Sequence, residues 1–306
     1  MSAKVAPAAL CLSYNGRHVI LASPTGAAHM DKGLPCQDAC MAVQQFYKGV
    51  PYTVLAVADG HGSEKYTRSE IGAHLAMLVV RDVVDQWVLG LGSFKDDAPD
   101  NRASRLRVDF EQRIGKQIPR QWREAVIEHA SKHPEDQVEA ESEASISRYG
   151  TTVALCILYE QMLLMAAIGD SSLFVLRHCA EGIVVEEVFT QQNGNQNVGL
   201  ATDSLSSPQA AYACQTSVKM LTCPDSSVAM VLLTTDGMTD SLREPERSVR
   251  DIYDKTMQYG LGWLQDTLPK QLRHWSEHGV GDDMGCVVFF LEDVDAEKES
   301  VQEDQS

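Results

Sequence analysis

Short apolar runs rich in Val, Ile and Leu recur along the chain and limit its possible folds more than any other feature. Their length and β-branched content are typical of buried strands. The runs lie at Val54–Ala58, Val153–Leu158, Leu163–Ile168, Leu173–Leu176, Ile183–Val188, Val228–Leu233 and Cys286–Leu291. Short polar or Gly-containing turns join several neighbours, so we expect antiparallel hairpins.

The apolar spacing changes in the first half of the chain. Residues 71–83 and 106–126 carry apolar side chains three or four positions apart, which predicts two long amphipathic helices. Residues 91–102, with a glycine and a proline, are predicted to form the loop between them. Pro119 is expected to kink or divide the second helix, because it lacks a backbone N–H.

A third helical region is predicted over Glu246–Glu277, broken around Gly260 and Pro269. Helix pairs therefore alternate with groups of antiparallel strands, without a strand–helix–strand rhythm. This order favours an α+β layered domain over a doubly wound one. The chain contains no internal repeat and no low-complexity linker, so we expect a single domain.

Composition narrows the possible partners. The chain has 306 residues, of which 44% are apolar, and a net charge of −17. This charge repels nucleic acid and anionic membrane surfaces, so neither is expected as a partner. We see no bilayer-spanning apolar run and no secretory signal, and we expect a cytoplasmic protein. The acidic segment Leu291–Ser306 is predicted to be a disordered tail.

The segment Val54–Gly62 ends a predicted strand in Asp59-Gly60-His61-Gly62. Asp59 offers hard oxygen ligands to Mg²⁺ or Mn²⁺, and Gly60 lets its carbonyl approach the same ion. His61 titrates near neutral pH. Asp-Gly is also a common hairpin turn, so this segment by itself fits a turn as well as a metal site.

Further acidic residues lie at the edges of other predicted strands: Asp38, Asp170, Asp236, Asp240, Asp282 and Asp283. A carboxylate at a strand end is rigidly held yet faces out of the sheet, as a hard-cation site requires. Two divalent ions that share a carboxylate lower the pKa of a water molecule between them. Each motif alone is a turn composition, but their joint occurrence indicates a metal-dependent hydrolase.

In this order the motifs resemble the metal-dependent protein phosphatase (PPM) family, the type 2C serine/threonine phosphatases. The matching segments are Asp59-Gly60-His61-Gly62, Gly150-Thr151-Thr152, Gly169-Asp170-Ser171, Thr235-Asp236-Gly237 and Asp282-Asp283-Met284. The segment Gly33–Ala39 further resembles a bacterial, single-domain branch. The resemblance implies a four-layer α-β-β-α sandwich of two mainly antiparallel sheets. It divides the chain into an extension (1–16), a catalytic domain (17–292) and an acidic tail (293–306).

The resemblance also implies two divalent ions, Mn²⁺ or Mg²⁺, with a third bound more weakly. Their ligands would be Asp38, Asp59, Gly60, Asp170, Asp236 and Asp282. Asp59 would bridge the two ions, and Asp38 would hold waters bound to them. Asp170 and Asp236 would support the third ion. Asp283, where the family often has Asn, is expected to orient its loop.

The implied reaction is hydrolysis of phosphoserine and phosphothreonine by a water that bridges the two metals. His61 would donate the proton to the leaving seryl or threonyl oxygen. The substrates would be phosphorylated proteins, targets of a cytoplasmic serine/threonine kinase, and we expect a monomer acting in bacterial signalling. Two alternatives stay open: a phosphatase-like module that only binds a partner, and a two-metal hydrolase of small phosphoesters.

Two positions depart from the family pattern. Gln37 stands where an acidic residue is common, which leaves the choice between Mn²⁺ and Mg²⁺ open. The arginine that usually binds the substrate phosphate is missing, and the nearby candidates are His29 and Lys32. Thr190–Cys223 lies where the family carries a variable flap, and we expect it to shape the selection of phosphoproteins.

Overall fold

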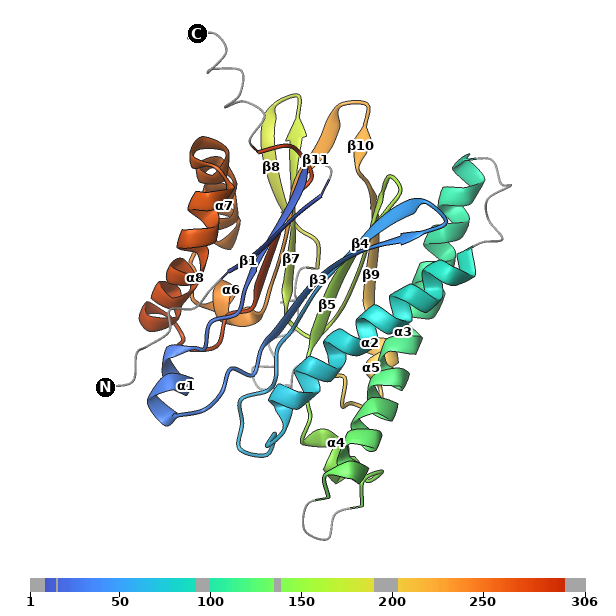
Figure 1. The fold of residues 1–306 in the computed structure, drawn as a ribbon, viewed down its shortest axis with the longest axis vertical. Coiled ribbons are helices and arrows are strands. Elements are labelled where there is room, and N and C mark those ends of the chain that lie inside the picture. The colour runs from blue at the N-terminus through green and yellow to red at the C-terminus, as the bar shows by residue number, and fades with distance from the viewer. Residues whose placement is uncertain (1–8, 15, 92–98, 135–138, 190–202, 295–306) are drawn as a thin grey trace. The chain divides into compact units, whose positions relative to one another are not determined.

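The computed structural model describes residues 9–14, 16–91, 99–134, 139–189 and 203–294 (Figure 1). The chain divides into two compact units, each built around its own sheet. The five-stranded unit comes from Gln37–Ser171 and Phe189–Leu221. The seven-stranded unit comes from Met1–Cys36, Ser172–Val188 and Thr222–Ser306. Both units therefore combine segments that are distant in sequence.

The sheet of the five-stranded unit has the order β3-β4-β5-β6-β9, with every neighbouring pair antiparallel. Its strands are β3 (Ala39–Tyr47), β4 (Val50–Ala58), β5 (Val153–Tyr159), β6 (Met162–Ile168) and β9 (Gln215–Met220). Its helices are α2 (Ser69–Gly90), α3 (Pro99–Lys132), α4 (Glu143–Ser147) and α5 (Ala210–Ala213). All described residues of β5 and β6 are buried, which explains why these strands are continuously apolar.

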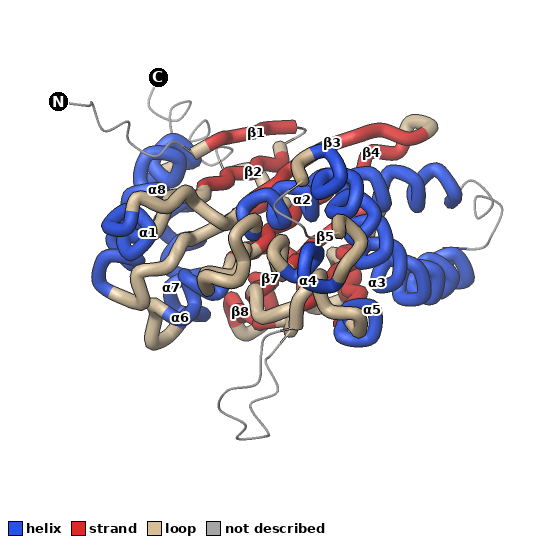
Figure 2. The backbone as a smooth tube through the Cα atoms, turned by 90° about the horizontal axis from the view of Figure 1, so that it is seen from below, coloured by secondary structure: helices blue, strands red, loops and turns tan. Residues whose placement is uncertain are grey.

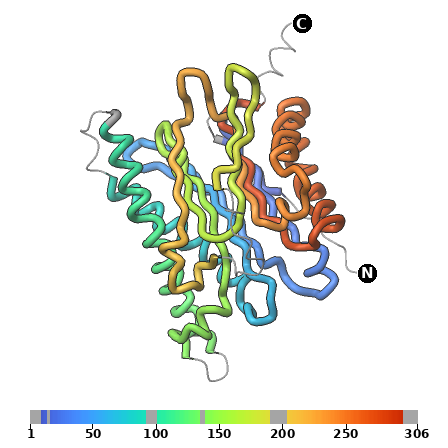
Figure 3. The backbone as a smooth tube through the Cα atoms, turned by 180° about the vertical axis from the view of Figure 1, so that it is seen from behind, coloured from blue at the N-terminus to red at the C-terminus, as the bar shows by residue number. Residues whose placement is uncertain are grey.

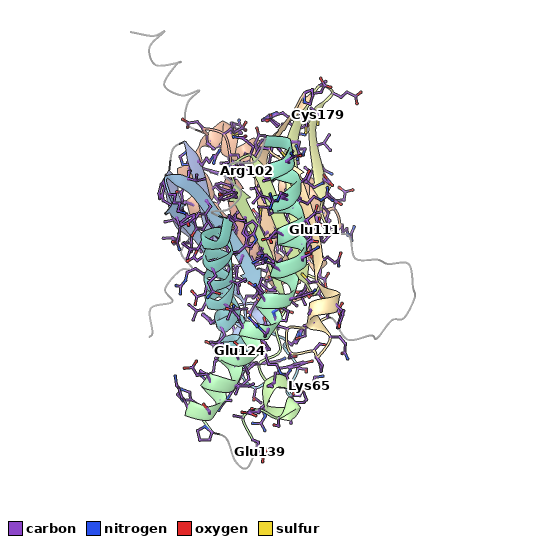
Figure 4. All side chains as sticks on the ribbon, turned by 90° about the vertical axis from the view of Figure 1, so that its right-hand side faces the viewer. Lys65, Arg102, Glu111, Glu124, Glu139 and Cys179 are labelled. Carbon is purple, nitrogen blue, oxygen red and sulfur yellow. The ribbon has the colours of Figure 1, made fainter. Side chains whose placement is uncertain are left out.

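The long helices α2 and α3 lie side by side and cover this sheet (Figure 2). Apolar side chains from both helices form one core with strand residues, and Phe110, Ile114 and Trp122 of α3 are fully buried. The outer side of α3 is charged, and Glu111 and Glu124 project from it (Figure 4). The predicted 3–4 apolar spacing therefore identifies the buried faces of these helices.

Gly72 is the point of closest approach between α2 and the segment before β5. A Cβ at this position would lie 1.8 Å from the carbonyl oxygen of Tyr149. The Gly72 carbonyl oxygen also accepts a 2.9 Å hydrogen bond from Trp122 Nε1. A larger residue would therefore displace the segment that carries Tyr149 from α2.

We expect Gly72→Ala to destabilise the protein by about 3 kcal/mol, at the upper end of the range for overpacked cores. Gly90→Ala is the matched control, because a Cβ at Gly90 of the same helix meets nothing within 4 Å. That change should be neutral or stabilising, by up to about 1 kcal/mol. Urea unfolding followed by circular dichroism measures both. Equal midpoints for Gly72→Ala and the unmodified protein would contradict the close approach.

The seven-stranded unit has the strand order β1-β2-β12-β11-β7-β8, with β10 paired to β11, and all its pairs are antiparallel. Its strands are β1 (Leu10–Tyr14), β2 (Arg17–Ala22), β7 (Ser172–Cys179), β8 (Gly182–Glu187), β10 (Thr222–Cys223), β11 (Ser226–Thr234) and β12 (Cys286–Phe290). Its helices are α1 (Ala27–Lys32), α6 (Asp236–Asp240), α7 (Pro245–Tyr259) and α8 (Leu261–His278). Strand β12 lies between β2 and β11, beside the early part of the chain (Figure 3).

Helices α7 and α8 bury their apolar faces on this sheet. Leu264, Leu268 and Leu272 of α8 lie in one core with β2, β11 and β12 residues. Val294, at the start of the predicted acidic tail, is 2% exposed and belongs to the same core. Residues 295–306 of that tail lie outside the described residues.

The predicted α+β class with two antiparallel sheets and flanking helix pairs is confirmed. The break at Gly260 is also confirmed, since α7 ends before it and α8 begins after it. The predicted break at Pro269 is wrong, because α8 runs through it, and Pro119 does not divide α3, which is also continuous. Burial of the apolar stripe on both sides of each proline outweighs one lost backbone hydrogen bond.

Several boundaries differ from the prediction. The predicted loop 91–102 ends earlier, since α3 begins at Pro99, and residues 92–98 lie outside the described residues. The predicted extension 1–16 contains β1, which pairs with β2. Of the predicted flap Thr190–Cys223, residues 190–202 lie outside the described residues. The remainder contains α5 and β9, so it is partly regular structure.

Candidate functional site

Asp59 follows directly after β4, and two threonines fix its main chain. Its N–H donates to Thr152 Oγ1 at 3.1 Å. Its carbonyl oxygen accepts bonds from the Thr152 N–H at 2.8 Å and from the Thr151 hydroxyl at 2.7 Å. The carboxylate of Asp59 is thus carried on a rigid strand end, as a metal or catalytic site requires.

Asp170 lies on the turn between β6 and β7, and a carboxylate oxygen of Asp170 lies within 4.8 Å of one of Asp59. The turn requires Gly169, whose φ is +106° and whose Cβ would lie 2.5 Å from Thr152 Cγ2. Thr152 Oγ1 also lies 3.1 Å from Ser171 Oγ. The Thr152 hydroxyl therefore contacts the segment of Asp59 and the turn of Asp170. Two carboxylates at this distance repel each other unless a cation or a proton compensates them. The pair therefore fits a divalent ion.

His61 is held beside this pair in the same unit. Its N–H donates to the Gly150 carbonyl at 3.1 Å, and its ring centroid lies 4.6 Å from that of Tyr66. Nε2 of His61 is buried and has no hydrogen-bond partner among the described residues. Burial lowers the pKa of His61 below its ordinary 6.5, with a smaller lowering from Lys65, while the charge of Asp170 acts in the opposite direction.

Asp38 immediately precedes β3 and is 5% exposed. The neighbouring Gln37 carbonyl oxygen accepts the Gly60 N–H at 3.2 Å. A Cβ at Gly60 would lie 2.7 Å from that oxygen and 2.9 Å from the main chain of Ser69, so only glycine fits. This contact brings the segment that carries Asp38 against the turn after β4. The five-stranded unit thus gathers five of the predicted residues: Asp38, Asp59, Gly60, His61 and Asp170.

Asp236 lies in the seven-stranded unit, as the first residue of α6. The preceding Thr235 donates its N–H to the Gly285 carbonyl at 3.0 Å and accepts the Gly285 N–H on Oγ1 at 2.9 Å. A Cβ at Gly237 would lie 3.4 Å from Asp282 Cβ. The predicted ligands Asp236 and Asp282 therefore lie on two segments in direct contact.

Asp283 connects its loop to α1. It is 2% exposed, its Oδ1 accepts the Gly26 N–H at 2.6 Å, and its Oδ2 lies 2.8 Å from His29 Nδ1. Its own N–H donates to Asp282 Oδ1 at 2.9 Å. Asp283 thus positions the exposed carboxylate of Asp282, which supports the orienting role predicted for it.

We expect Asp283→Ala to lower the free energy of unfolding by about 2–4 kcal/mol, because two buried groups, the Gly26 N–H and the His29 ring, lose their partner. Asp283→Asn is the matched control, since its amide oxygen still accepts from Gly26 and its amide nitrogen still reaches His29. It should cost less than half as much. Guanidinium unfolding of both variants measures the difference, and equal losses would show that these two contacts do not stabilise the fold.

The two predicted substrate-phosphate residues lie in different surroundings. His29 is 7% exposed and contacts Asp283, which assigns it a positioning role in α1. Lys32 is exposed at the last position of α1.

Sequence reasoning missed three polar residues that shape the site. Thr152 holds the main chain of Asp59, and Tyr66 packs on the His61 ring from the segment between Gly62 and α2. Ser276 Oγ donates to the Asp282 carbonyl at 2.8 Å and accepts the Ala27 N–H at 2.9 Å. A serine on the apolar stripe of a predicted helix is the signal that could have identified Ser276.

Comparisons with known proteins agree with the resemblance to the type 2C phosphatases. The sequence profile of the protein phosphatase 2C family matches residues 25–275. No curated protein sequence matches the chain. Within the described residues, no helix combines the length and the apolar character needed to cross a membrane.

Solved structures of low sequence identity share the fold. A serine-threonine phosphatase 2C from Toxoplasma gondii has a TM-score of 0.66 and 11% identity, over 94% of this chain and 98% of that one. The catalytic domain of the serine threonine protein phosphatase PstP, in complex with two manganese ions, has a TM-score of 0.55 and 14% identity, over 90% and 97%. Because the family profile covers most of the sequence, the chain belongs to the protein phosphatase 2C family of serine/threonine phosphatases.

Proposed function

We propose that this protein hydrolyses phosphoserine and phosphothreonine in proteins with two divalent ions. The observation that carries the proposal is the arrangement at the end of β4. There, the Asp59 and Asp170 carboxylates approach within 4.8 Å, and the electrostatics of His61 respond to Asp170. Clustered carboxylates next to a buried imidazole are typical of hydrolytic centres.

The donor set fits hard divalent cations. The proposed ligands of the five-stranded unit are all oxygen donors, from Asp38, Asp59, Asp170 and the Gly60 carbonyl, and Mg²⁺ and Mn²⁺ prefer such ligands. We propose that Asp236 and Asp282 complete the shells of the same ions, with Asp170 and Asp236 serving a third, weaker one. The two manganese ions of PstP support this assignment. When bound, the ions would lower the pKa of the attacking water.

His61 is proposed to protonate the leaving seryl or threonyl oxygen. Its Nε2 has no hydrogen-bond partner among the described residues, which leaves it free to bond a substrate atom, and the Tyr66 ring packs against the imidazole. A positioned acid at the leaving oxygen accelerates such reactions by about 10²–10⁴-fold. Lys32 is the proposed contact for the substrate phosphate, since His29 is engaged by Asp283.

The proposal extends to the substrates, the location and the domain bounds. We propose that the substrates are phosphorylated proteins, targets of a cytoplasmic serine/threonine kinase in bacterial signalling, and that the protein acts as a cytoplasmic monomer. Residues 17–292 would form the catalytic domain, preceded by an extension and followed by the acidic tail. The segment 190–223 would contribute to substrate choice.

The test is hydrolysis of a phosphothreonine peptide and of an aryl phosphate by the purified protein with Mn²⁺, Mg²⁺ or a chelator. We expect turnover of both substrates with either metal and none with the chelator. Activity on the aryl phosphate alone would favour a small-phosphoester hydrolase. Binding of the phosphopeptide without turnover in any metal would instead identify a phosphatase-like binding module.

A further inference from the structure

A second group of metal-ligating side chains lies on the last turns of α8, on its exposed side. His274, Glu277 and His278 each offer one ligand atom, and these atoms lie within 4.8 Å of one another. Their spacing, His-x-x-Glu-His, places all three on one face of a helix. None of them belongs to the acidic site described above.

A backbone hydrogen bond orients the His278 imidazole so that one ring nitrogen can bind a cation. His278 Nδ1 lies 2.9 Å from the His274 carbonyl oxygen, to which it can only donate, so in the neutral ring the lone pair resides on Nε2. A backbone bond of this kind fixes the tautomer and ring orientation of metal-ligating histidines. The two imidazole centroids lie 4.2 Å apart, so their nitrogen atoms can face a shared ion.

Electrostatics at this position favour a cation as well. The group lies at the C-terminal end of α8, where the helix dipole is negative. Glu277 adds a carboxylate, and the whole chain carries a net charge of −17. A divalent cation therefore meets a favourable field.

A second histidine pair, with similar ring spacing, serves as a comparison for the pair on α8. His129 and His133 also lie four residues apart at a helix end, with ring centroids 4.4 Å apart. His129 Nδ1 contacts the Tyr149 hydroxyl at 2.9 Å, and Arg68 bonds to the same hydroxyl at 2.5 Å. Burial and neighbouring cations lower the pKa of His129. Among the described residues, no carboxylate joins that pair as a third ligand, and cations lie beside it, so it is the poorer of the two pairs for a divalent ion.

We propose that His274, Glu277 and His278 bind one borderline divalent cation of the Zn²⁺ class. Imidazole nitrogen suits Zn²⁺, Cu²⁺ and Ni²⁺, whereas Mg²⁺ prefers oxygen ligands, so this ion differs in kind from those proposed for the acidic site. Two histidines and one glutamate supply three of the four ligands of a tetrahedral zinc ion, and water supplies the fourth. The site is exposed on the helix surface and binds the ion without a role in phosphate hydrolysis.

The experiment is titration of the full chain with Zn²⁺ by isothermal calorimetry, in excess Mg²⁺ to fill the proposed acidic site. We expect one Zn²⁺ to bind this surface. His274→Ala and His278→Ala should each weaken it by more than about tenfold, since even the outer partners of ligating histidines are worth 10–100-fold. Glu277→Gln should weaken it less. All three residues are exposed, so the variants should keep the fold.

The matched control is His129→Ala, which removes one member of the other pair and should leave Zn²⁺ binding unchanged. Cu²⁺ added to the full chain gives an independent readout, because its electron paramagnetic resonance spectrum reports two nitrogen ligands, and His278→Ala should reduce them to one. Equal Zn²⁺ affinity in His274→Ala, His278→Ala and the unmodified protein would overturn the proposal. The proposal would also be overturned if His129→Ala failed to bind this one Zn²⁺.

Discussion

Asp59→Asn is expected to abolish metal-dependent turnover, with kcat/KM for a phosphothreonine peptide falling by at least about 10³-fold. The loss is large because ion-assisted activation of water and stabilisation of charge supply several kcal/mol, and each 1.36 kcal/mol is a factor of ten. Asparagine keeps the shape of the side chain but removes the charge that would hold two ions together. Initial rates over a range of Mn²⁺ concentrations measure the effect.

The fold should survive this change. The bonds from Thr151 and Thr152 reach only main-chain atoms of Asp59, so the thermal midpoint should stay near that of the unmodified protein or rise as carboxylate repulsion falls. Asp225→Asn, in the exposed turn between β10 and β11, is the matched control and should retain full activity. If Asp59→Asn keeps more than about a tenth of the activity at saturating Mn²⁺, Asp59 is not the bridging ligand.

His61→Ala is expected to lower kcat by about 10²–10⁴-fold on a phosphothreonine peptide, the usual contribution of a positioned general acid. The loss on an aryl phosphate should be much smaller, because a phenolate leaves without protonation. The ratio of the two losses is therefore the diagnostic quantity. Single-turnover measurements isolate the chemical step from product release.

Another histidine provides the comparison for this experiment. His74 lies exposed on α2 with its ring bonded to the Glu70 carbonyl at 2.8 Å, so His74→Ala should leave both rates unchanged. A loss in His61→Ala that is equal on both substrates would assign His61 to substrate binding or to the support of Asp59. That result would leave the leaving oxygen without its proposed acid.

The strands that are easiest to predict from sequence are those with a uniform environment, although the run at Ile183–Val188 also identifies β8, whose burial alternates. β5 and β6 are buried along their whole length, so an unbroken apolar run suffices to identify them. β9 escaped prediction because it is an edge strand with a mostly polar, half-exposed sequence, and its partner β6 lies distant in the chain. Pairing with a distant strand overrides local propensity, which is why such strands are missed.

The site residues also differ in how far the sequence predicts them. Carboxylates after apolar runs, such as Asp59 and Asp170, are visible in sequence because their position on a strand end follows from the run itself. The contact between His29 and Asp283 joins residues 254 positions apart in the chain, and no local pattern predicts it. Close approaches such as Gly72 against Tyr149 depend on tertiary packing, so a glycine in a helix gave no sign of its role.

The central place of β12 in its sheet has a consequence for how the protein is made. This strand, near the end of the chain, separates β2 from β11, so the seven-stranded sheet cannot close until residue 290 has left the ribosome. Strand pairings this distant in sequence form slowly. Until they form, β2 and β11 have unpaired edges, which promote aggregation. Asp282 arrives with the same late segment, so a nascent or prematurely terminated chain would lack both the closed sheet and one proposed ligand. Any activity that needs this sheet and Asp282 therefore depends on synthesis having passed residue 290.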